Sequence, residues 1–181
     1  MKTRPARQLR VLVSAASKHG STTEIGTVIG NALQDKGVGV DIVPPGAVDS
    51  IADYDAVILG SAVYLGHWLA PAQDFIIRFR DELAKRPVWL FSSGPVGDPS
   101  GRLARSLERD SADITAIRWD ISPQDHHVFA GKLDPQVLSF PHASQVIFHG
   151  MSGDFRDWAE VTHWAEEIAG QLTAPRPGTG D

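Results

Sequence analysis

One short stretch combines hydroxyl groups, a lysine and a glycine in a way that suits phosphate binding. It runs from Ser14 to Thr22 and reads S-A-A-S-K-H-G-S-T. A β-branched run precedes it and a helical pattern follows it, so its backbone N–H groups would meet an anion at the positive end of a helix dipole. The residues predicted to bind the phosphate are Ser14, Ser17, Lys18, His19, Gly20, Ser21 and Thr22.

The same loop also fits a simpler structural role. Ser and Thr before a helix are also the pattern of a plain N-cap, and for Thr22 alone capping is the favoured interpretation. For the loop as a whole, phosphate binding is favoured. The stretch matches neither G-x-x-x-x-G-K-[ST] nor G-x-G-x-x-G, which argues against ATP, GTP and a standard dinucleotide site.

The elements around this loop alternate between strand and helix patterns. Continuous apolar runs predict strands, whereas apolar residues at helical spacing predict helices. Strands that are apolar throughout favour a parallel sheet with helices on both faces. The predicted strands are 10–14, 38–43, 56–60, 87–92 and 126–130, and the predicted helices are 21–36, 69–83, 102–109 and 155–172. Two stretches have alternative predictions. Residues 111–124 could form an irregular excursion or contain an extra strand, and residues 135–150 could form a helix and a strand or a long loop.

Two further loops would lie at the same carboxyl edge of the sheet, where ligands of open α/β sheets collect. In the loop after the third strand, Gly66 allows close backbone approach to a flat ring, and two aromatic side chains offer faces. For Trp68, packing at the start of the following helix is as strongly favoured as contact with the ring. The predicted site residues in the loop after the third strand are Ser61, Ala62, Val63, Tyr64, Gly66 and Trp68. Those in the loop after the fourth strand are Ser93, Gly94, Pro95, Val96, Gly97 and Asp98. Lys132, after the fifth strand, is placed at the same edge.

Four segments in order resemble the flavodoxin family, in the subgroup that includes menaquinone-dependent protoporphyrinogen oxidase. They are S-A-A-S-K-H-G-S-T-T-E from Ser14, I-L-G-S-A-V-Y-L-G-H-W at 58–68, V-F-A-G-K-L-D at 128–134 and G-D-F-R-D-W-A-E at 153–160. The resemblance implies a flavodoxin-like three-layer α/β sandwich with a five-stranded parallel sheet of order 2-1-3-4-5. It also implies that the three loops hold FMN, with the second bordering the isoalloxazine and the third bonding its pyrimidine edge.

Composition limits the class of protein. The chain has 181 residues, a net charge of −5 and no cysteine, which excludes disulfides and thiol chemistry and gives no sign of nucleic-acid binding. We expect one domain over 1–172, a flexible tail over 173–181, a cytoplasmic location and no stable membrane insertion.

His126 and His127 point to opposite faces of a strand, so no metal site is predicted. Arg156 and Asp157 are interpreted as a local charge arrangement, and Trp158 and Trp164 as core residues.

The expected function is that of a redox protein that carries electrons or a hydride through its cofactor. The flavin supplies the chemistry, so no catalytic side chain is nominated and the choice between electron carrier and oxidoreductase stays open. An 8-hydroxy-5-deazaflavin coenzyme is the alternative cofactor. Protoporphyrinogen oxidation and a non-redox binding module are the alternative functions. The expected partner is a redox protein or a small-molecule electron donor or acceptor, and the oligomeric state is left open.

Overall fold

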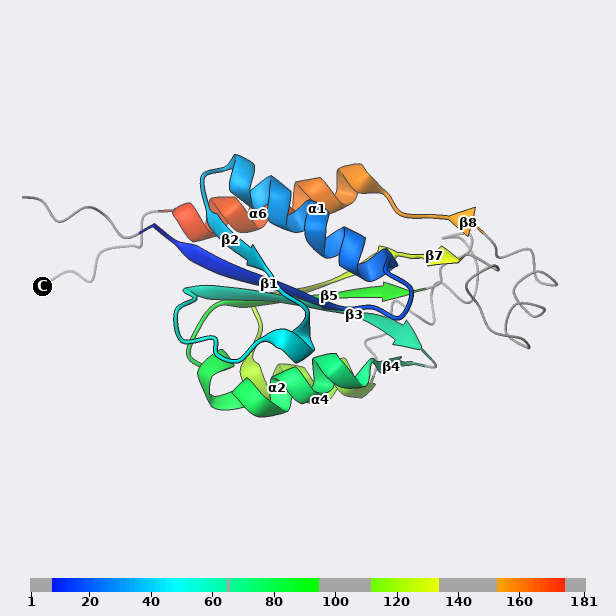
Figure 1. Ribbon diagram of the computed structural model, residues 1–181, viewed down its shortest axis with the longest axis horizontal. Coiled ribbons are helices and arrows are strands. Elements are labelled where there is room, and N and C mark those ends of the chain that lie inside the picture. Colours follow the sequence, from blue (N-terminus) through cyan, green and yellow to red (C-terminus); the bar gives the residue numbers. More distant parts are fainter. Residues whose placement is uncertain (1–7, 65, 95–111, 134–152, 175–181) are drawn as a thin grey trace, which may run out of the picture.

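A parallel sheet forms the centre of the molecule (Figure 1). The computed structural model describes residues 8–64, 66–94, 112–133 and 153–174. The parallel strands are β1 (Arg10–Ala16), β2 (Gly39–Ile42), β3 (Ala56–Tyr64), β5 (Val88–Gly94) and β6 (Asp125–Ala130), in the order β2-β1-β3-β5-β6. A two-residue strand, β4 (His67–Trp68), pairs antiparallel with the end of β3. With β4 left out of the count, this is the predicted order 2-1-3-4-5, and the predicted flavodoxin-like fold is confirmed.

Helices cover the sheet on both faces, which makes three layers (Figure 1). Helices α1 (Ser21–Asp35) and α6 (Trp158–Thr173) lie on one face. The other face carries α2 (Ala70–Leu83), α4 (Ala112–Ile121) and the short 3-10 turn η1 (Pro45–Ala47). No helix within the described ranges is long and apolar enough to cross a membrane.

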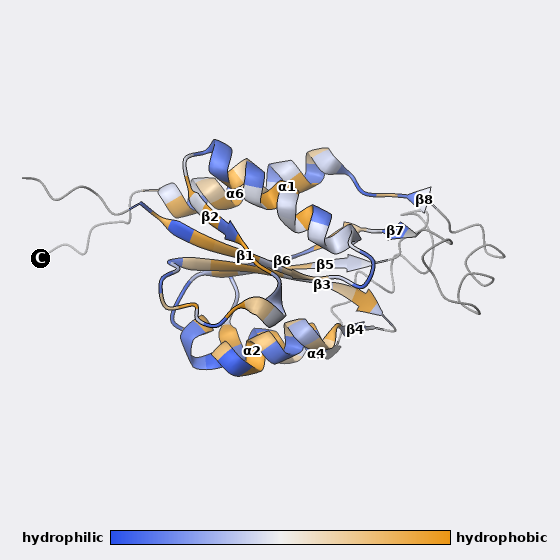
Figure 2. Ribbon diagram, viewed as in Figure 1, coloured by the Kyte–Doolittle hydropathy of each residue, from blue (hydrophilic) through white to orange (hydrophobic). Residues whose placement is uncertain are grey.

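Each face of the sheet has its own apolar core, because successive strand residues point to opposite sides. In β1, Val11 and Val13 belong to the core under α1 and α6, whereas Leu12 belongs to the core under α2 and α4. All three side chains are fully buried. Figure 2 shows the resulting pattern, with the central strands β1 and β3 largely apolar and with polar residues on the outer sides of the helices. The central strands β1, β3 and β5 are buried on both faces and therefore lack the alternating pattern of a half-exposed sheet, whereas the edge strands β2 and β6 are only partly buried.

Two glycines allow close packing on the side of the sheet that α1 and α6 cover. A Cβ at Gly60 in β3 would overlap the ring of Phe91 in β5, and a Cβ at Gly30 in α1 would lie 2.6 Å from Ile42 Cδ1. Phe91 also meets Phe129 and Trp164 edge to face, at centroid distances of 6.0 and 6.3 Å. The absence of a side chain at Gly60 is thus what lets an aromatic cluster sit directly on the sheet.

Some predicted boundaries were wrong. Residues 112–121 form helix α4 and neither an irregular excursion nor a strand, because Ile114, Ile117 and Ile121 recur at helical spacing and are all buried against the sheet. Strand β3 continues to Tyr64 instead of ending at Gly60, since it pairs with β5 as far as Ala62 and then with β4. The predicted helix over 102–109 and the open stretch 135–150 lie outside the described residues.

The last helix also begins later than predicted. Asp157 is the N-cap of α6, and its carboxylate accepts hydrogen bonds from Ala159 N at 2.9 Å and Glu160 N at 3.1 Å. Two short strands precede it and pair antiparallel: β7 (Lys132–Leu133) and β8 (Gly153–Asp154). This β7–β8 pair brings segments from before and after the undescribed stretch 134–152 to one edge of the fold.

Candidate functional site

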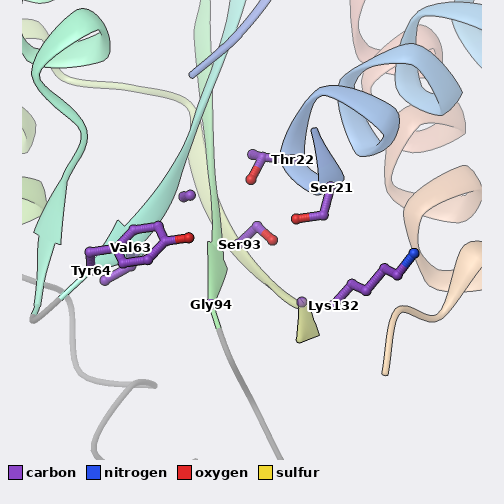
Figure 3. A pocket seen from close by; sticks show the side chains of 9 residues that line it. Ser21, Thr22, Val63, Tyr64, Ser93, Gly94 and Lys132 are labelled. Atoms are coloured by element: carbon purple, nitrogen blue, oxygen red, sulfur yellow. The ribbon is translucent and has the colours of Figure 1, made fainter. Parts of the chain in front are cut away.

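A cleft lies at the carboxyl edge of the parallel sheet, next to the start of α1 (Figure 3). The cleft is open to solvent, and the space free of protein atoms at its mouth, open solvent included, is about 310 Å³. Segments that are far apart in the sequence meet there, namely the start of α1, the ends of β3 and β5, and β7. The lining residues are Ser21, Thr22, Ala62, Val63, Tyr64, Ser93, Gly94, Gly131 and Lys132.

The first wall of the cleft is the start of α1. Gly20 is the N-cap residue with a φ of 88°, a left-handed conformation that glycine adopts without steric cost. Since Gly20 has no side chain, it cannot cap the helix as a serine or threonine would. Ser17 reaches in from the loop instead, and its Oγ accepts a hydrogen bond of 3.3 Å from Thr22 N. The N-cap interpretation of Thr22 was therefore wrong, because Thr22 lies one residue inside the helix.

The hydroxyl group of Thr22 in this wall is buried without a hydrogen-bond partner among the described residues. Figure 3 shows this oxygen directed into the space between Ser21, Ser93 and Tyr64. A buried hydroxyl left without a partner is costly, so such groups in native proteins call for an explanation. A ligand atom in the cleft would satisfy it.

The second wall is formed by the end of β3. Tyr64 stands on the side of the cleft opposite Ser21 (Figure 3), and 39% of its surface is exposed. Partial burial raises the pKa of the Tyr64 phenol above its ordinary value. The ammonium group of Lys18 lies over the Tyr64 ring, 5.5 Å from its centroid. Gly66 follows with a φ of 81° and allows the chain to turn back into β4.

Three of the predicted site residues use their polar groups inside the protein. Ser14 is fully buried and its Oγ donates to Val43 O at 2.7 Å. Ser61 Oγ donates to Ala62 O at 2.9 Å and accepts from the backbone at the start of α2 at 2.9 Å. Trp68 is 2% exposed. None of the three lines the cleft, and they lie behind its walls.

Trp68 has a clear packing role, which was one of the two interpretations of this residue. Its indole Nε1 donates to Ser92 Oγ at 2.9 Å, and Ser92 Oγ lies 2.8 Å from His126 Nε2. Its backbone N donates to Asp113 Oδ2 at 2.8 Å, and Gln73 Nε2 donates to the same oxygen at 3.2 Å. These contacts anchor β4 to α4 and to the sheet, and so hold the end of β3 that carries the cleft residues.

The third predicted loop is described only at its start. Ser93 and Gly94, the last residues of β5, line the cleft, whereas Pro95, Val96, Gly97 and Asp98 lie outside the described residues. Two lining residues, Gly131 and Lys132, were not among the predicted site residues, although Lys132 was expected at this edge. A Gly-Lys pair directly after the fifth strand was the signal that could have added both.

The two adjacent histidines of β6 do not converge. His126 is paired with Ser92, whereas His127 Nε2 lies 3.0 Å from Glu160 Oε1 in α6, and the His127 ring is tilted against that of Phe129 at a centroid distance of 4.5 Å. Among the described residues, no group of three His, Asp or Glu side chains is arranged to hold a metal ion. His126 and His127 thus serve opposite faces of the sheet.

A buried arginine lies directly behind the start of α1. Arg156 takes part in a local charge arrangement with Asp154, two residues before it, and also pairs with the distant Glu24. Asp157 is occupied as the helix cap described above. Trp158 was expected in the core but is 38% exposed, with the Arg156 guanidinium 4.4 Å above its ring, whereas Trp164 is buried as predicted.

Comparison with known proteins agrees with this architecture. The chain is 22% identical over 174 residues to "Protoporphyrinogen IX dehydrogenase [quinone]" of Escherichia coli (strain K12), which covers 89% of this chain and 95% of the relative. It is 29% identical over 147 residues to the protein of the same name from Leishmania major, covering 70% of this chain and 60% of that relative. Among solved structures, a mutant of flavodoxin from Pseudomonas aeruginosa superimposes with a TM-score of 0.62 and 13% identity, covering 92% of this chain and all of the other. The sequence model of the flavodoxin domain matches residues 12–154, and the chain therefore belongs to the flavodoxin domain family.

Proposed function

We propose that this protein binds FMN in the cleft and passes electrons or a hydride between redox partners. The observation that carries the proposal is the Thr22 hydroxyl, which is buried, has no described partner and points into the cleft at the start of a helix. A phosphate at that position would accept its hydrogen bond and face the positive end of the helix dipole.

The residues around Thr22 fit the phosphate end of such a cofactor. Ser21 lines the cleft beside it, and Ser17 Oγ lies within hydrogen-bond distance of the Thr22 backbone. Lys132 lines the cleft from β7, and none of the described lining residues is acidic. The exposed residues Lys18 and His19 complete the loop. The Lys132 ammonium group is directed away from Thr22 and Ser93 (Figure 3), so the hydroxyl groups and the absence of a lining carboxylate among the described residues are what favour a phosphate monoester.

The other end of the cleft fits a flat ring. Tyr64 offers an aromatic face, while Val63 and Gly94 line the same space. When bound, FMN would supply reversible electron and hydride transfer. The role of the chain is then to hold the phosphate, to stack against the ring and to limit water around it. An 8-hydroxy-5-deazaflavin coenzyme carries the same kinds of groups, so it is the alternative ligand.

The test of this proposal is the cofactor itself. The visible spectrum of the purified protein and mass spectrometry of the material released on denaturation identify a bound flavin or deazaflavin. Protein freed of cofactor is then titrated with FMN, with riboflavin and with the deazaflavin coenzyme. We expect FMN to bind more tightly than riboflavin, because riboflavin lacks the phosphate. A protein that binds none of the three would refute the proposal.

A double variant tests the location of the phosphate. Ser17→Ala together with Thr22→Val should weaken FMN binding strongly and leave riboflavin binding almost unchanged, with the fold intact by circular dichroism. Thr23→Val is the matched control, since Thr23 is the exposed neighbour of Thr22 and does not line the cleft. Equal affinity of the double variant and the control for FMN would mean that the phosphate binds elsewhere.

A second candidate function follows from the relatives. The Escherichia coli protein that aligns with 89% of this chain carries the name "Protoporphyrinogen IX dehydrogenase [quinone]". We therefore propose protoporphyrinogen IX and a quinone as the first substrate pair to assay, with porphyrin fluorescence as the readout under exclusion of oxygen. Flavin reduction by a protein donor without any porphyrin formation would favour the electron-carrier role instead.

A further inference from the structure

Arg156 joins the start of α1 to the segment that precedes α6. Its Nη1 donates to Ser21 O at 3.3 Å and to Glu24 Oε2 at 2.6 Å. Its Nε and Nη2 donate to the two carboxylate oxygens of Asp154 at 2.8 and 2.6 Å. The side chain is 4% exposed, and its guanidinium stacks on Trp158. Residues more than 130 positions apart in the sequence are thus fixed to one another.

These contacts leave Arg156 little capacity to bind a ligand. A guanidinium has five N–H donors, and four of them are directed to Ser21, Glu24 and Asp154. Its charge also faces two carboxylates. The bidentate pair with Asp154 has the planar geometry that only arginine can supply. Arg156 therefore acts on the cleft through its partners.

The partners of Arg156 connect it to two residues that line the cleft. Ser21 lines it directly, and its carbonyl is held by Arg156. Asp154 of β8 is the register partner of Lys132 in β7, and Lys132 lines the cleft from the other side. A single buried side chain thus sets the position of the first turn of α1 relative to β7.

Arg156 has an electrostatic effect in the same place. Glu24 lies in the first turn of α1, where a carboxylate is favoured by the helix dipole but repels an anionic ligand at the same helix end. The pair with Arg156 offsets that negative charge. Without Arg156, Glu24 would compete with a phosphate for the positive end of the helix.

We propose that Arg156 is a positioning residue that prepares the start of α1 for a phosphate monoester, by holding Ser21 against the β7–β8 pair and by neutralising Glu24. This inference rests on the proposed binding of a phosphorylated flavin. It assigns phosphate selectivity to a residue that does not itself line the cleft.

The experiment compares the affinity for FMN with the affinity for riboflavin in each variant, by quenching of flavin fluorescence. For Arg156→Gln we expect the dissociation constant of FMN to rise by roughly tenfold or more, the loss that about 1.4 kcal/mol produces, while that of riboflavin stays nearly constant. Arg156→Lys keeps the charge but not the bidentate geometry, and we expect an intermediate value. Adding Glu24→Gln to Arg156→Gln should restore part of the FMN affinity, since it removes the repelling charge.

The outcomes separate the inference from the function on which it rests. If the wild type prefers FMN and Arg156→Gln keeps the same ratio of FMN to riboflavin affinity, the positioning role is wrong and the proposed function stands. If the wild type binds neither ligand, both fail. Asp154 and Glu24 have side chains that are 40% and 58% exposed, so the substitution leaves no buried charge unpaired and the variant should fold. Should it fail to fold, Arg156→Lys with an unchanged affinity ratio would contradict the inference equally.

Discussion

Thr22→Val should change stability and cofactor affinity in opposite directions. Valine has nearly the same shape as threonine but lacks the hydroxyl group. In Thr22 this group is buried and has no hydrogen-bond partner among the described residues. Removing an unsatisfied buried polar group recovers its desolvation penalty, which is about 1–3 kcal/mol. In a chain of this length, about 1 kcal/mol corresponds to a shift of about 2–4 °C in Tm. In the absence of flavin we therefore expect the variant to melt several degrees above the wild type.

The same substitution should weaken FMN binding. A hydrogen bond to a charged group contributes about 1.5–3 kcal/mol, and about 1.4 kcal/mol is tenfold in affinity. The dissociation constant of FMN should therefore rise by about 10- to 150-fold, while that of riboflavin stays nearly constant. Such a gain in stability with a loss of function is expected where a site holds strained or unsatisfied groups.

The assay is thermal unfolding without flavin, combined with fluorescence titration of both ligands. Thr23→Val provides the control, because the neighbouring hydroxyl is exposed to solvent. We expect this control to alter neither quantity appreciably. A Thr22→Val protein that is less stable than the wild type and binds FMN equally well would refute the reasoning, since the hydroxyl would then be satisfied within the protein and not by the phosphate.

Two further predictions concern packing and pH. Gly60→Ala should lower the free energy of unfolding by about 1–3 kcal/mol, because the new Cβ overlaps the Phe91 ring, whereas Gly170→Ala has open space in α6 and should raise it by up to about 1 kcal/mol. Urea denaturation of both variants measures this, and equal effects would contradict the packing argument. Hydrogen bonds from Arg156 hold the pKa of Asp154 below its ordinary value of 3.8. The stability that Asp154 contributes is therefore present above about pH 4 and lost as the pH falls through the lower, folded-state pKa. Asp154→Asn should make the unfolding free energy less sensitive to pH in that acidic window, and an unchanged pH profile would count against this pair.

The fold was predictable to a large extent because its signals are local. The sequence alternates between continuous apolar runs, typical of buried strands, and helices with an apolar stripe. This alternation predicts a parallel sheet with helices on both faces. Helix α4 carried a readable signal as well, since its three isoleucines recur at helical spacing. The boundaries at β3 and α6 were missed for another reason: they depend on pairing with β4 and on the cap formed by Asp157.

The candidate site was predictable in part. The run from Ser17 to Thr22 identified a hydroxyl-rich loop before a helix, and Tyr64 and Ser93 were assigned to neighbouring strand ends that the structure brings to one cleft. The sequence could not separate residues that line the cleft from residues behind it. Ser14 and Ser21 look alike in the printed chain, but one donates to Val43 O and the other faces the cleft.

The sequence by itself determined the order of strands and helices and the chemistry of the loop at the carboxyl edge, since both depend on residue types over short distances. Only the tertiary structure decided how that loop is held. The contacts of Arg156 with Ser21 and Glu24 join residues more than 130 positions apart, and the partner of a charged side chain over such a distance is chosen by packing and not by spacing. The unsatisfied hydroxyl of Thr22 is a property of the same kind, because burial and the lack of a partner among the described residues exist only once the surrounding elements have come together.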